Sequence, residues 1–170
     1  MTALATADLA DAFEARFADG SLAVLGAGWL ALGGRIAFSG PCVTLQVFED
    51  NSLLAELVKT PGEGRVIVVD GGGSVRCALL GGNLAKAAHD NRWSGIVLHG
   101  AARDADEIDA CDLGVRALAL SPRRSVKRGA GLRNVPLAID GVRVQPGDWI
   151  YADRDGVLVS RAELRLSSIE

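Results

Sequence analysis

The sequence contains no apolar run long enough to cross a membrane and no apolar segment near its start. None of its apolar stretches reaches the roughly 18 residues of a transmembrane helix. Asp8, Asp11 and Glu14 stand where a secretory signal would need its apolar core. We therefore expect a cytoplasmic protein that does not associate with membranes.

Metal-binding cysteine pairs, nucleotide-binding glycine motifs and extended basic segments are also missing. The three cysteines Cys42, Cys77 and Cys111 have no CxxC spacing, so we expect reduced thiols and no zinc site. Gly71-Gly72-Gly73 does not continue as GxGxxG into a helix, which gives no support for a dinucleotide or methyl-donor site. The formal net charge is −3 with scattered cations, which argues against nucleic-acid binding. The short basic segment 123–128 is either a solvated loop or a contact for an anion or a partner.

Length and composition indicate one folded domain spanning residues 1–170. A chain of 170 residues is long enough for a real core and too short for two typical domains. Apolar residues make up 49% and charged residues 23%, which is ordinary for a globular protein and excludes a dominant disordered segment.

The segment 65–104 is predicted to form the centre of the fold. Arg65–Asp70 and Val75–Leu80 are apolar runs that predict strands, each followed by glycines. Asn83–His89 contains good helix formers, with Leu84, Ala87 and Ala88 predicted to form its core face. Gly95–Gly100 predicts another strand, which leads directly to Arg103-Asp104.

Segments on either side predict further helices and strands. We expect a Thr6-capped helix over Thr6–Phe17 and strands within Arg35–Phe48, bent or interrupted at Gly40-Pro41. The remaining predicted elements are helices over Leu53–Val58 and Ala105–Cys111 and a strand over Val115–Leu120.

The last third of the chain is typical of antiparallel sheet. Asp140-Gly141 between alternating runs predicts a hairpin, and Trp149–Ala152 and Val157–Val159 predict two more strands. Strand-helix alternation followed by hairpins predicts a layered mixed α/β fold with two sheet regions.

We expect the functional site at the N-terminus of the predicted central helix. The amides of Gly81, Gly82, Asn83 and Leu84 at a helix N-terminus favour a carboxylate or phosphate. Arg103-Asp104 ends a strand, where loop residues face a crevice in open α/β sheets. Asp104 suits a hard divalent cation whose remaining ligands are waters, and Arg103 suits a carboxylate or oxo group. The alternative for this pair is a surface ion pair or a loop cap.

Other polar residues have simpler interpretations. Asp70 is a metal ligand or a cap for the amides of its glycine turn. Asp153 and Asp155 lack most of a calcium loop and predict a hairpin turn. His89 and His99 are interpreted as a helix-surface residue and a strand residue rather than as metal ligands.

Several short motifs, in this order, resemble the RraA-like family, which comprises regulators of ribonuclease E activity and 4-hydroxy-4-methyl-2-oxoglutarate aldolases. The resemblance runs from about Ala5 to Val159. The segments that carry it are Phe38–Pro41, Glu49–Asn51, Val68–Ser74, Gly81–Ala85, Trp93–Gly95, Gly100–Asp104, Ser125–Gly129 and Pro146–Trp149.

The resemblance implies a swivelling β/β/α fold, a homotrimer or dimer of trimers, and a lyase site dependent on Mg²⁺ or Mn²⁺. Gly81–Leu84 would bind the substrate carboxylate, Arg103 the oxo group of a 2-oxo acid, and Asp104 the metal. The implied activities are 4-hydroxy-4-methyl-2-oxoglutarate aldolase and oxaloacetate decarboxylase, which share a pyruvate enolate. The alternative is a non-catalytic regulator that binds ribonuclease E.

The chain departs from the pattern at Gly82, where aldolase members often carry an acidic residue. Cleavage of the aldol needs an acceptor for the proton of the 4-hydroxyl, whereas decarboxylation does not. Our hypothesis from the sequence is that decarboxylation is at least as fast as aldol cleavage.

Overall fold

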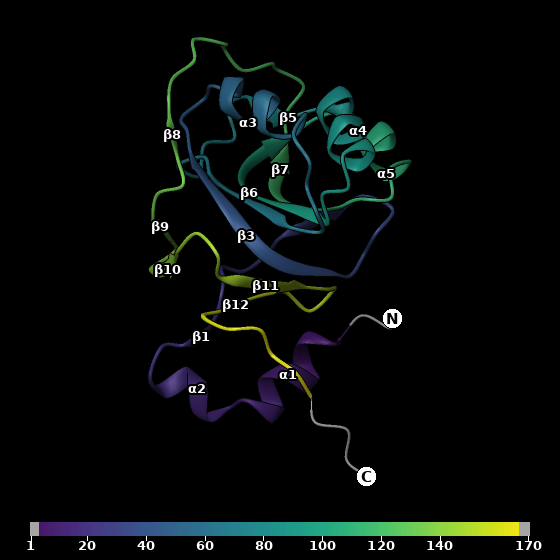
Figure 1. Ribbon diagram of the computed structural model, residues 1–170. Helices are drawn as coiled ribbons and strands as arrows, with labels where there is room; N and C mark the ends of the chain where they lie inside the picture. Colours follow the sequence, from purple (N-terminus) through teal and green to yellow (C-terminus); the bar gives the residue numbers. More distant parts are fainter. Residues whose placement is uncertain (1–3, 167–170) are drawn as a thin grey trace.

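The computed structural model describes residues 4–166, and four parallel strands form the centre of the fold (Figure 1). They lie in the order β3 (Phe38–Gln46), β4 (Val66–Asp70), β6 (Gly95–Ala102) and β7 (Gly114–Leu120). Three short strands extend this layer: β5 (Ala78–Leu80) pairs with β6, β2 (Leu30–Leu32) with β7, and β8 (Leu132–Arg133) with β3.

A second layer is antiparallel and is joined to the first through β3. It consists of β1 (Leu22–Val24), β12 (Val157–Ser160) and β11 (Trp149–Ala152). The first part of β3 pairs with β11 as far as Pro41, and the second part pairs with β4 from Cys42 onward. One curved strand therefore belongs to both layers.

Helices cover the outer face of the parallel layer. They are α3 (Ser52–Leu57), α4 (Gly82–Asp90) and α5 (Ala105–Asp109), at one end of the molecule (Figure 1). Ile67 and Val69 of β4 pack into the core beneath these helices, whereas Val66 and Val68 pack into the core between the two sheet layers. Both faces of this strand are buried, which explains its continuous apolar sequence.

Two further units complete the fold. The hairpin of β9 (Leu137–Ile139) and β10 (Val142–Val144) closes the core between the layers. Helices α1 (Thr6–Ala12) and α2 (Ala15–Ala18) lie at the far end, where Leu9 packs with Tyr151 and Leu158 of the antiparallel layer.

The predicted mixed α/β fold, with two sheet regions and a helical layer, is confirmed, but the predicted N-terminal helix is wrong in two ways. Thr6–Phe17 is not one helix, since α1 ends at Ala12 and α2 begins at Ala15. Thr6 does not cap it either. Its hydroxyl and its backbone N–H both donate to the carboxylate of Asp153, at 2.7 Å each, so a distant turn anchors the helix start.

Other boundaries differ in smaller ways. Gly40-Pro41 does not interrupt β3, since this is where the continuous strand changes partner. The predicted strand from Val75 shortens to Ala78–Leu80, and the helix predicted to reach Cys111 ends at Asp109. The core face of α4 is centred on Ala85 and Ala88, with Leu84 and Ala87 only partly buried.

Across residues 4–166, no helix combines the length and the apolar character that a bilayer-spanning segment requires.

Candidate functional site

The two halves of the predicted site meet because β5 and β6 are adjacent parallel strands. Leu80 is paired with Ala102, and the carbonyl of Leu80 accepts a hydrogen bond of 2.8 Å from the N–H of Arg103. The turn Gly81-Gly82 that starts α4 and the pair Arg103-Asp104 that starts α5 therefore leave the same edge of the sheet.

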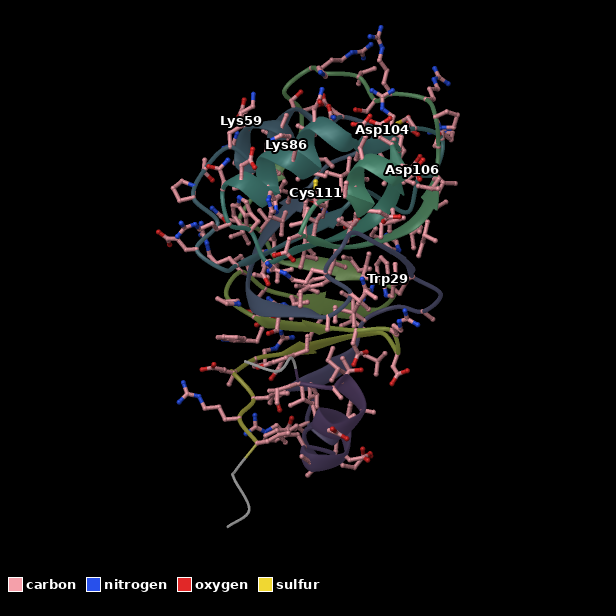
Figure 2. All side chains as sticks on the ribbon, turned by 90° about the vertical axis from the view of Figure 1, so that its right-hand side faces the viewer. Trp29, Lys59, Lys86, Asp104, Asp106 and Cys111 are labelled. Atoms are coloured by element: carbon pink, nitrogen blue, oxygen red, sulfur yellow. The ribbon has the colours of Figure 1, made fainter. Side chains whose placement is uncertain are left out.

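Asp104 lies directly against the start of α4. Its Oδ2 accepts a hydrogen bond of 3.0 Å from the N–H of Gly82. Its backbone is left-handed, with φ 60°, which is uncommon for a residue other than glycine and marks a conformation that the surrounding fold imposes. Asp104 sits beside α4 and α5, at the end of the molecule opposite α1 and α2 (Figure 2).

Arg103 passes over Gly81. A Cβ atom at Gly81 would lie 3.6 Å from both Cγ and Nε of Arg103, and 2.9 Å from Oδ2 of Asp104. The guanidinium reaches on toward the carbonyl of Pro122, with Nη1 at 3.4 Å. A side chain at position 81 would therefore touch Arg103 and crowd the carboxylate of Asp104.

The helix start is less open than the sequence predicts, because Asp104 already occupies the N–H of Gly82. The first backbone bond of α4 runs from Ala85 to the carbonyl of Gly81, so the amides of Asn83 and Leu84 have no acceptor within the helix. These two amides remain to bind an anion.

The opposite wall is a loop, residues 121–131, which supplies Arg124, Ser125 and Lys127. Ser125 is 93% buried, since its exposed fraction is 7%, and its hydroxyl has no hydrogen-bond partner among the described residues. Asn51 lies just before α3, and its Nδ2 donates a hydrogen bond of 3.2 Å to the carbonyl of Leu79. Its buried Oδ1 also has no hydrogen-bond partner among the described residues. Two unsatisfied buried polar atoms in residues that line one cavity indicate that a further group completes their hydrogen bonds.

Asp50 holds this loop in place. Its Oδ1 accepts bonds from the N–H and hydroxyl of Ser52, at 2.9 and 2.6 Å, and its Oδ2 accepts bonds from the amides of Arg128 and Ala130, at 2.8 and 3.3 Å. Burial alone would raise the pKa of Asp50, but these hydrogen bonds outweigh it and lower the pKa to about 2. The carboxylate is ionised at neutral pH and joins α3 to the loop.

Together these groups line a cavity of about 190 Å³. Arg103, Arg124 and Lys127 bring three positive charges to it, against the single carboxylate of Asp104. This volume suits a small acid better than a ligand of drug size, which typically occupies a pocket of about 300–1,000 Å³.

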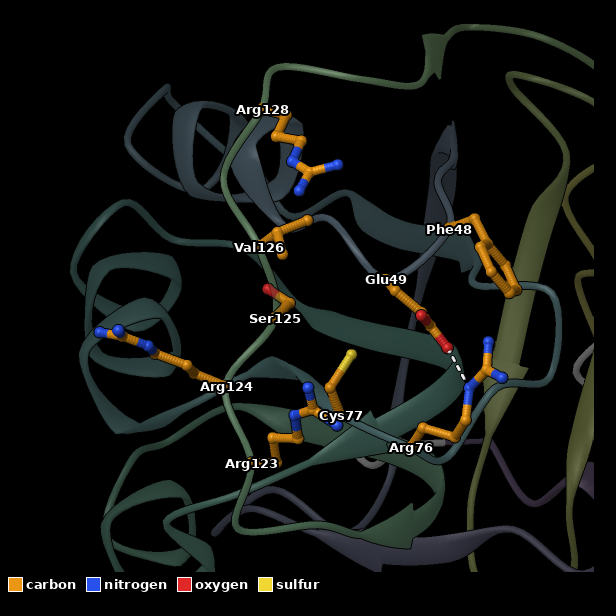
Figure 3. A pocket seen from close by; sticks show the side chains of 9 residues that line it. All are labelled: Phe48, Glu49, Arg76, Cys77, Arg123, Arg124, Ser125, Val126 and Arg128. Carbon is orange, nitrogen blue, oxygen red and sulfur yellow. Dashed lines mark hydrogen bonds and ion pairs between the residues drawn. The ribbon is translucent and has the colours of Figure 1, made fainter.

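A second and wider hollow lies on the other side of the same loop (Figure 3). Its volume is about 510 Å³, and it shares Arg124 and Ser125 with the first cavity. In this hollow Glu49 accepts a hydrogen bond of 2.6 Å from Nε of Arg76, and this bond lowers the pKa of Glu49. The basic segment of the sequence is thus a wall shared by two hollows.

A divalent cation fits the residues present only in a water-rich form. No group of three or more His, Cys, Asp or Glu side chains within 4–166 could hold a metal ion. Asp104 is exposed and uses one oxygen for Gly82, which leaves Oδ1 available. One carboxylate with several waters is a usual arrangement for Mg²⁺.

The other polar candidates lie outside this cavity and follow their simpler interpretations. Oδ1 of Asp70 accepts a hydrogen bond of 2.9 Å from the amide of Gly72. Asp153 accepts one of 2.9 Å from the amide of Asp155, so both carboxylates cap turns. His89 is exposed beside the carbonyl of Asp112, and Nε2 of His99 lies 3.5 Å from Asp140.

Sequence reasoning placed Gly81–Leu84, Arg103 and Asp104 in one unit but did not single out Asn51, Arg124, Ser125 or Lys127 as site residues. Two of the motif segments that carry the family resemblance, Glu49–Asn51 and Ser125–Gly129, contained most of the signal. The long-range bonds of Asp50, together with backbone hydrogen bonds from Asn51 to Val126 and from Val126 to Glu49, bring these two segments together.

The fold and cavity define a mixed α/β protein with a small cationic cavity at the carboxyl ends of parallel strands. The chain belongs to the RraA-like family, described as Aldolase/RraA, which it matches over residues 6–159. Proteins of Burkholderia mallei and Burkholderia pseudomallei named "Putative 4-hydroxy-4-methyl-2-oxoglutarate aldolase" are 56% identical over 156 residues, covering 92% of this chain and 94% of theirs. These names support an aldolase role.

Solved structures agree with the fold and carry other descriptions. "RNA-processing inhibitor RraA" from Thermus thermophilis superposes with a TM-score of 0.89 at 41% identity, covering 99% of this chain and 98% of that one. A structure described as "S-adenosylmethionine: 2-dimethylmenaquinone methyltransferase" from Geobacillus kaustophilus has a TM-score of 0.88 at 44% identity, covering 95% and 97%.

Proposed function

We propose that this protein is a metal-dependent (class II) lyase that cleaves a C–C bond of a small 2-oxo acid. The substrates are 4-hydroxy-4-methyl-2-oxoglutarate, cleaved as an aldol, and oxaloacetate, which is decarboxylated. The observation that carries the proposal is the meeting of Arg103, Asp104 and the start of α4 in one small cationic cavity. The names of the aldolase relatives support the same reaction class.

In this proposal each residue has a task set by its position. The amides of Asn83 and Leu84 bind the substrate carboxylate, as a helix N-terminus favours. The guanidinium of Arg103 faces the 2-oxo oxygen, where negative charge grows as the bond breaks. Asp104 would hold Mg²⁺ or Mn²⁺, which supplies additional positive charge beside that oxygen.

Both reactions leave the same enolate of pyruvate. An electron pair released from the broken carbon bond moves onto the 2-oxo oxygen, and Arg103 stabilises it there. Decarboxylation needs nothing more from the protein, so we expect it to be at least as fast as aldol cleavage. A rate of aldol cleavage far above the rate of decarboxylation would contradict this expectation.

The test is pyruvate formation from each substrate, followed through lactate dehydrogenase and NADH. Asp104→Asn should lower kcat/KM at least about 100-fold with Mg²⁺ present, and EDTA should suppress the wild-type rate. The matched control is Asp106→Asn, which removes an exposed carboxylate two residues farther along, outside the cavity. Full activity in EDTA, or equal activity of Asp104→Asn and wild type, would refute the proposal.

The likeness to the RNA-processing inhibitor supports a second candidate, a non-catalytic protein that binds ribonuclease E. This candidate predicts no pyruvate from either substrate, together with binding to ribonuclease E that survives Asp104→Asn. Calorimetry with purified ribonuclease E and the two assays above separate the two functions.

We extend the proposal to a homotrimer or a dimer of trimers. Phe48 and Val126 line the wider hollow and are 59% and 45% exposed, and Leu132, which is 55% exposed, lines a neighbouring depression that also contains Phe48. A second subunit would cover such apolar groups. Light scattering after gel filtration should give three or six times the 17.7 kDa of one chain. A monomer would rule this part out.

A further inference from the structure

The wider hollow on the other side of loop 121–131 carries a strong excess of positive charge. Its charged lining residues are one carboxylate and four arginines: Glu49, Arg76, Arg123, Arg124 and Arg128. Glu49 is already paired with Arg76, at 2.6 Å between Oε1 and Nε. Within residues 4–166 the other three guanidinium groups form no ion pair, so the hollow has no carboxylate left to compensate them.

The loop that bears these three arginines is bonded to its neighbours on both sides. The carbonyl of Arg123 accepts a hydrogen bond of 2.7 Å from the N–H of Ala78, at the start of β5. The N–H of Val126 donates one of 3.1 Å to the carbonyl of Glu49, ahead of α3. The arginines therefore extend from a backbone that is held in place, and Arg76 faces them across the hollow (Figure 3).

Ser125 lies between these two points of attachment and also lines the hollow. It is 7% exposed, and its hydroxyl has no hydrogen-bond partner among the described residues. A buried hydroxyl without a partner is rare in native folds and indicates that a ligand or a water completes it. The loop thus offers an unused donor beside three unpaired cations.

Volume and charge together select the class of ligand. The hollow measures about 510 Å³, against about 190 Å³ for the first cavity. Guanidinium groups bind phosphate and carboxylate oxygens through paired hydrogen bonds. Three of them along one loop suit a ligand whose charged oxygens extend over several atoms, as in a chain of phosphate groups. A single phosphate or a small acid reaches only part of such a row.

We propose that this hollow binds a chain of two or more phosphate groups, either as free pyrophosphate or as the diphosphate of a nucleotide. The phosphate oxygens accept hydrogen bonds from Arg123, Arg124 and Arg128. The hydroxyl of Ser125 donates to one of the same oxygens. This binding site is separate from the proposed lyase reaction and does not depend on it.

The test is calorimetry on the protein in its own oligomeric state, with EDTA present so that no divalent cation takes part. Pyrophosphate, ADP, orthophosphate and citrate are titrated in turn. Arg123→Gln and Arg128→Gln each remove a guanidinium that lines the hollow and not the first cavity. The matched control is Arg154→Gln, which removes the same charge from an exposed position between β11 and β12.

Pyrophosphate should bind wild type at least about 10-fold more tightly than orthophosphate or citrate, because it engages more guanidinium groups at once. Each hollow variant should weaken pyrophosphate binding about 10-fold, the scale of one charged hydrogen bond. Arg154→Gln should leave binding unchanged. Tighter binding of ADP than of pyrophosphate would identify a nucleotide as the ligand, and equal or weaker binding would identify free pyrophosphate.

Three results would overturn the proposal. The first is no binding of pyrophosphate or ADP, which is also the result expected if a second subunit closes the hollow. The second is binding of orthophosphate or citrate as tight as that of pyrophosphate. The third is wild-type affinity in both Arg123→Gln and Arg128→Gln.

The first cavity is tested separately, because the start of α4 also attracts anions. Arg103→Lys alters that cavity and should leave pyrophosphate binding unchanged. Weaker binding in Arg103→Lys, with none of the hollow variants affected, would place pyrophosphate at α4 and reject the hollow. Calorimetry does not measure pyruvate, so an inactive wild type would refute the lyase function and leave this binding site standing.

Discussion

Replacing Asp50 by asparagine should loosen one wall of the cavity without touching the predicted metal ligand. Asp50 is 2% exposed, and its two oxygens accept four hydrogen bonds from Ser52, Arg128 and Ala130. An asparagine can keep the bonds to Ser52 but then turns an NH₂ group toward the two loop amides. Two donors would face each other in place of a bond.

The decrease in the free energy of unfolding can be estimated from the two hydrogen bonds to the loop amides. A hydrogen bond to a charged acceptor contributes about 1.5–3 kcal/mol. Arg128 and Ala130 are exposed residues whose amides can regain water, so the lower value applies to each. The free energy of unfolding should fall by about 3 kcal/mol, which corresponds to a decrease in Tm of roughly 6–12 °C for a domain of this size.

The effect should depend on pH in a defined direction. The folded-state pKa of Asp50 is about 2, below the ordinary 3.8, so its contribution is complete above pH 4 and is lost as pH falls toward 2. The stability difference between wild type and Asp50→Asn should therefore shrink between pH 4 and pH 2. Because the loop carries Ser125 and Lys127, the variant should also bind oxalate more weakly.

Urea unfolding followed by circular dichroism at pH 7 and pH 3 measures both quantities. Asp106→Asn is the control, and as an exposed surface change it should alter the free energy of unfolding by less than about 0.5 kcal/mol. A variant as stable as wild type at pH 7, or a stability difference as large at pH 3 as at pH 7, would refute the role given to Asp50.

Three further predictions concern separate parts of the molecule. Gly62→Ala should lower the free energy of unfolding by about 1–3 kcal/mol in urea melts, because its Cβ would lie 2.4 Å from the backbone nitrogen of Trp93. Cys42 should resist iodoacetamide at pH 8 and react once urea is added, since burial and then the carboxylate of Asp148 raise its pKa to about 12. Only about one thiol in ten thousand is then the reactive thiolate. Peptide mass spectrometry gives the labelled fraction. Arg103→Lys should lower kcat/KM for oxaloacetate at least about 30-fold because a planar guanidinium fork is lost, and a rate near wild type would remove Arg103 from the mechanism.

The parallel part of the fold could be read from the sequence because local patterns determine it. The predicted strands Arg65–Asp70 and Gly95–Gly100 contain the uninterrupted apolar runs 66–69 and 95–98, and β4 and β6 are buried on both faces as that pattern predicts. Glycines at 81–82 marked the start of α4 correctly. The predicted cap at Thr6 was wrong because the partner of Thr6, Asp153, is 147 residues away and leaves no local signal.

The proximity of the predicted site residues was also predictable from local patterns. Gly81–Leu84 and Arg103-Asp104 flank neighbouring strands, so adjacency in the sheet brings them together. Asn51 and Ser125 line the cavity together because Asp50 and backbone hydrogen bonds to Val126 join their two segments, which are distant in the sequence. Long-range contacts of this kind have no periodicity or spacing that a single sequence shows.

The central claim is tested most directly by a crystal structure of the protein soaked with pyruvate and Mg²⁺. The account predicts the pyruvate carboxylate on the amides of Asn83 and Leu84, its oxo oxygen beside Arg103, and Mg²⁺ bound to Asp104. Pyruvate bound elsewhere, or an Asp104 that binds no cation while pyruvate is present, would contradict the account.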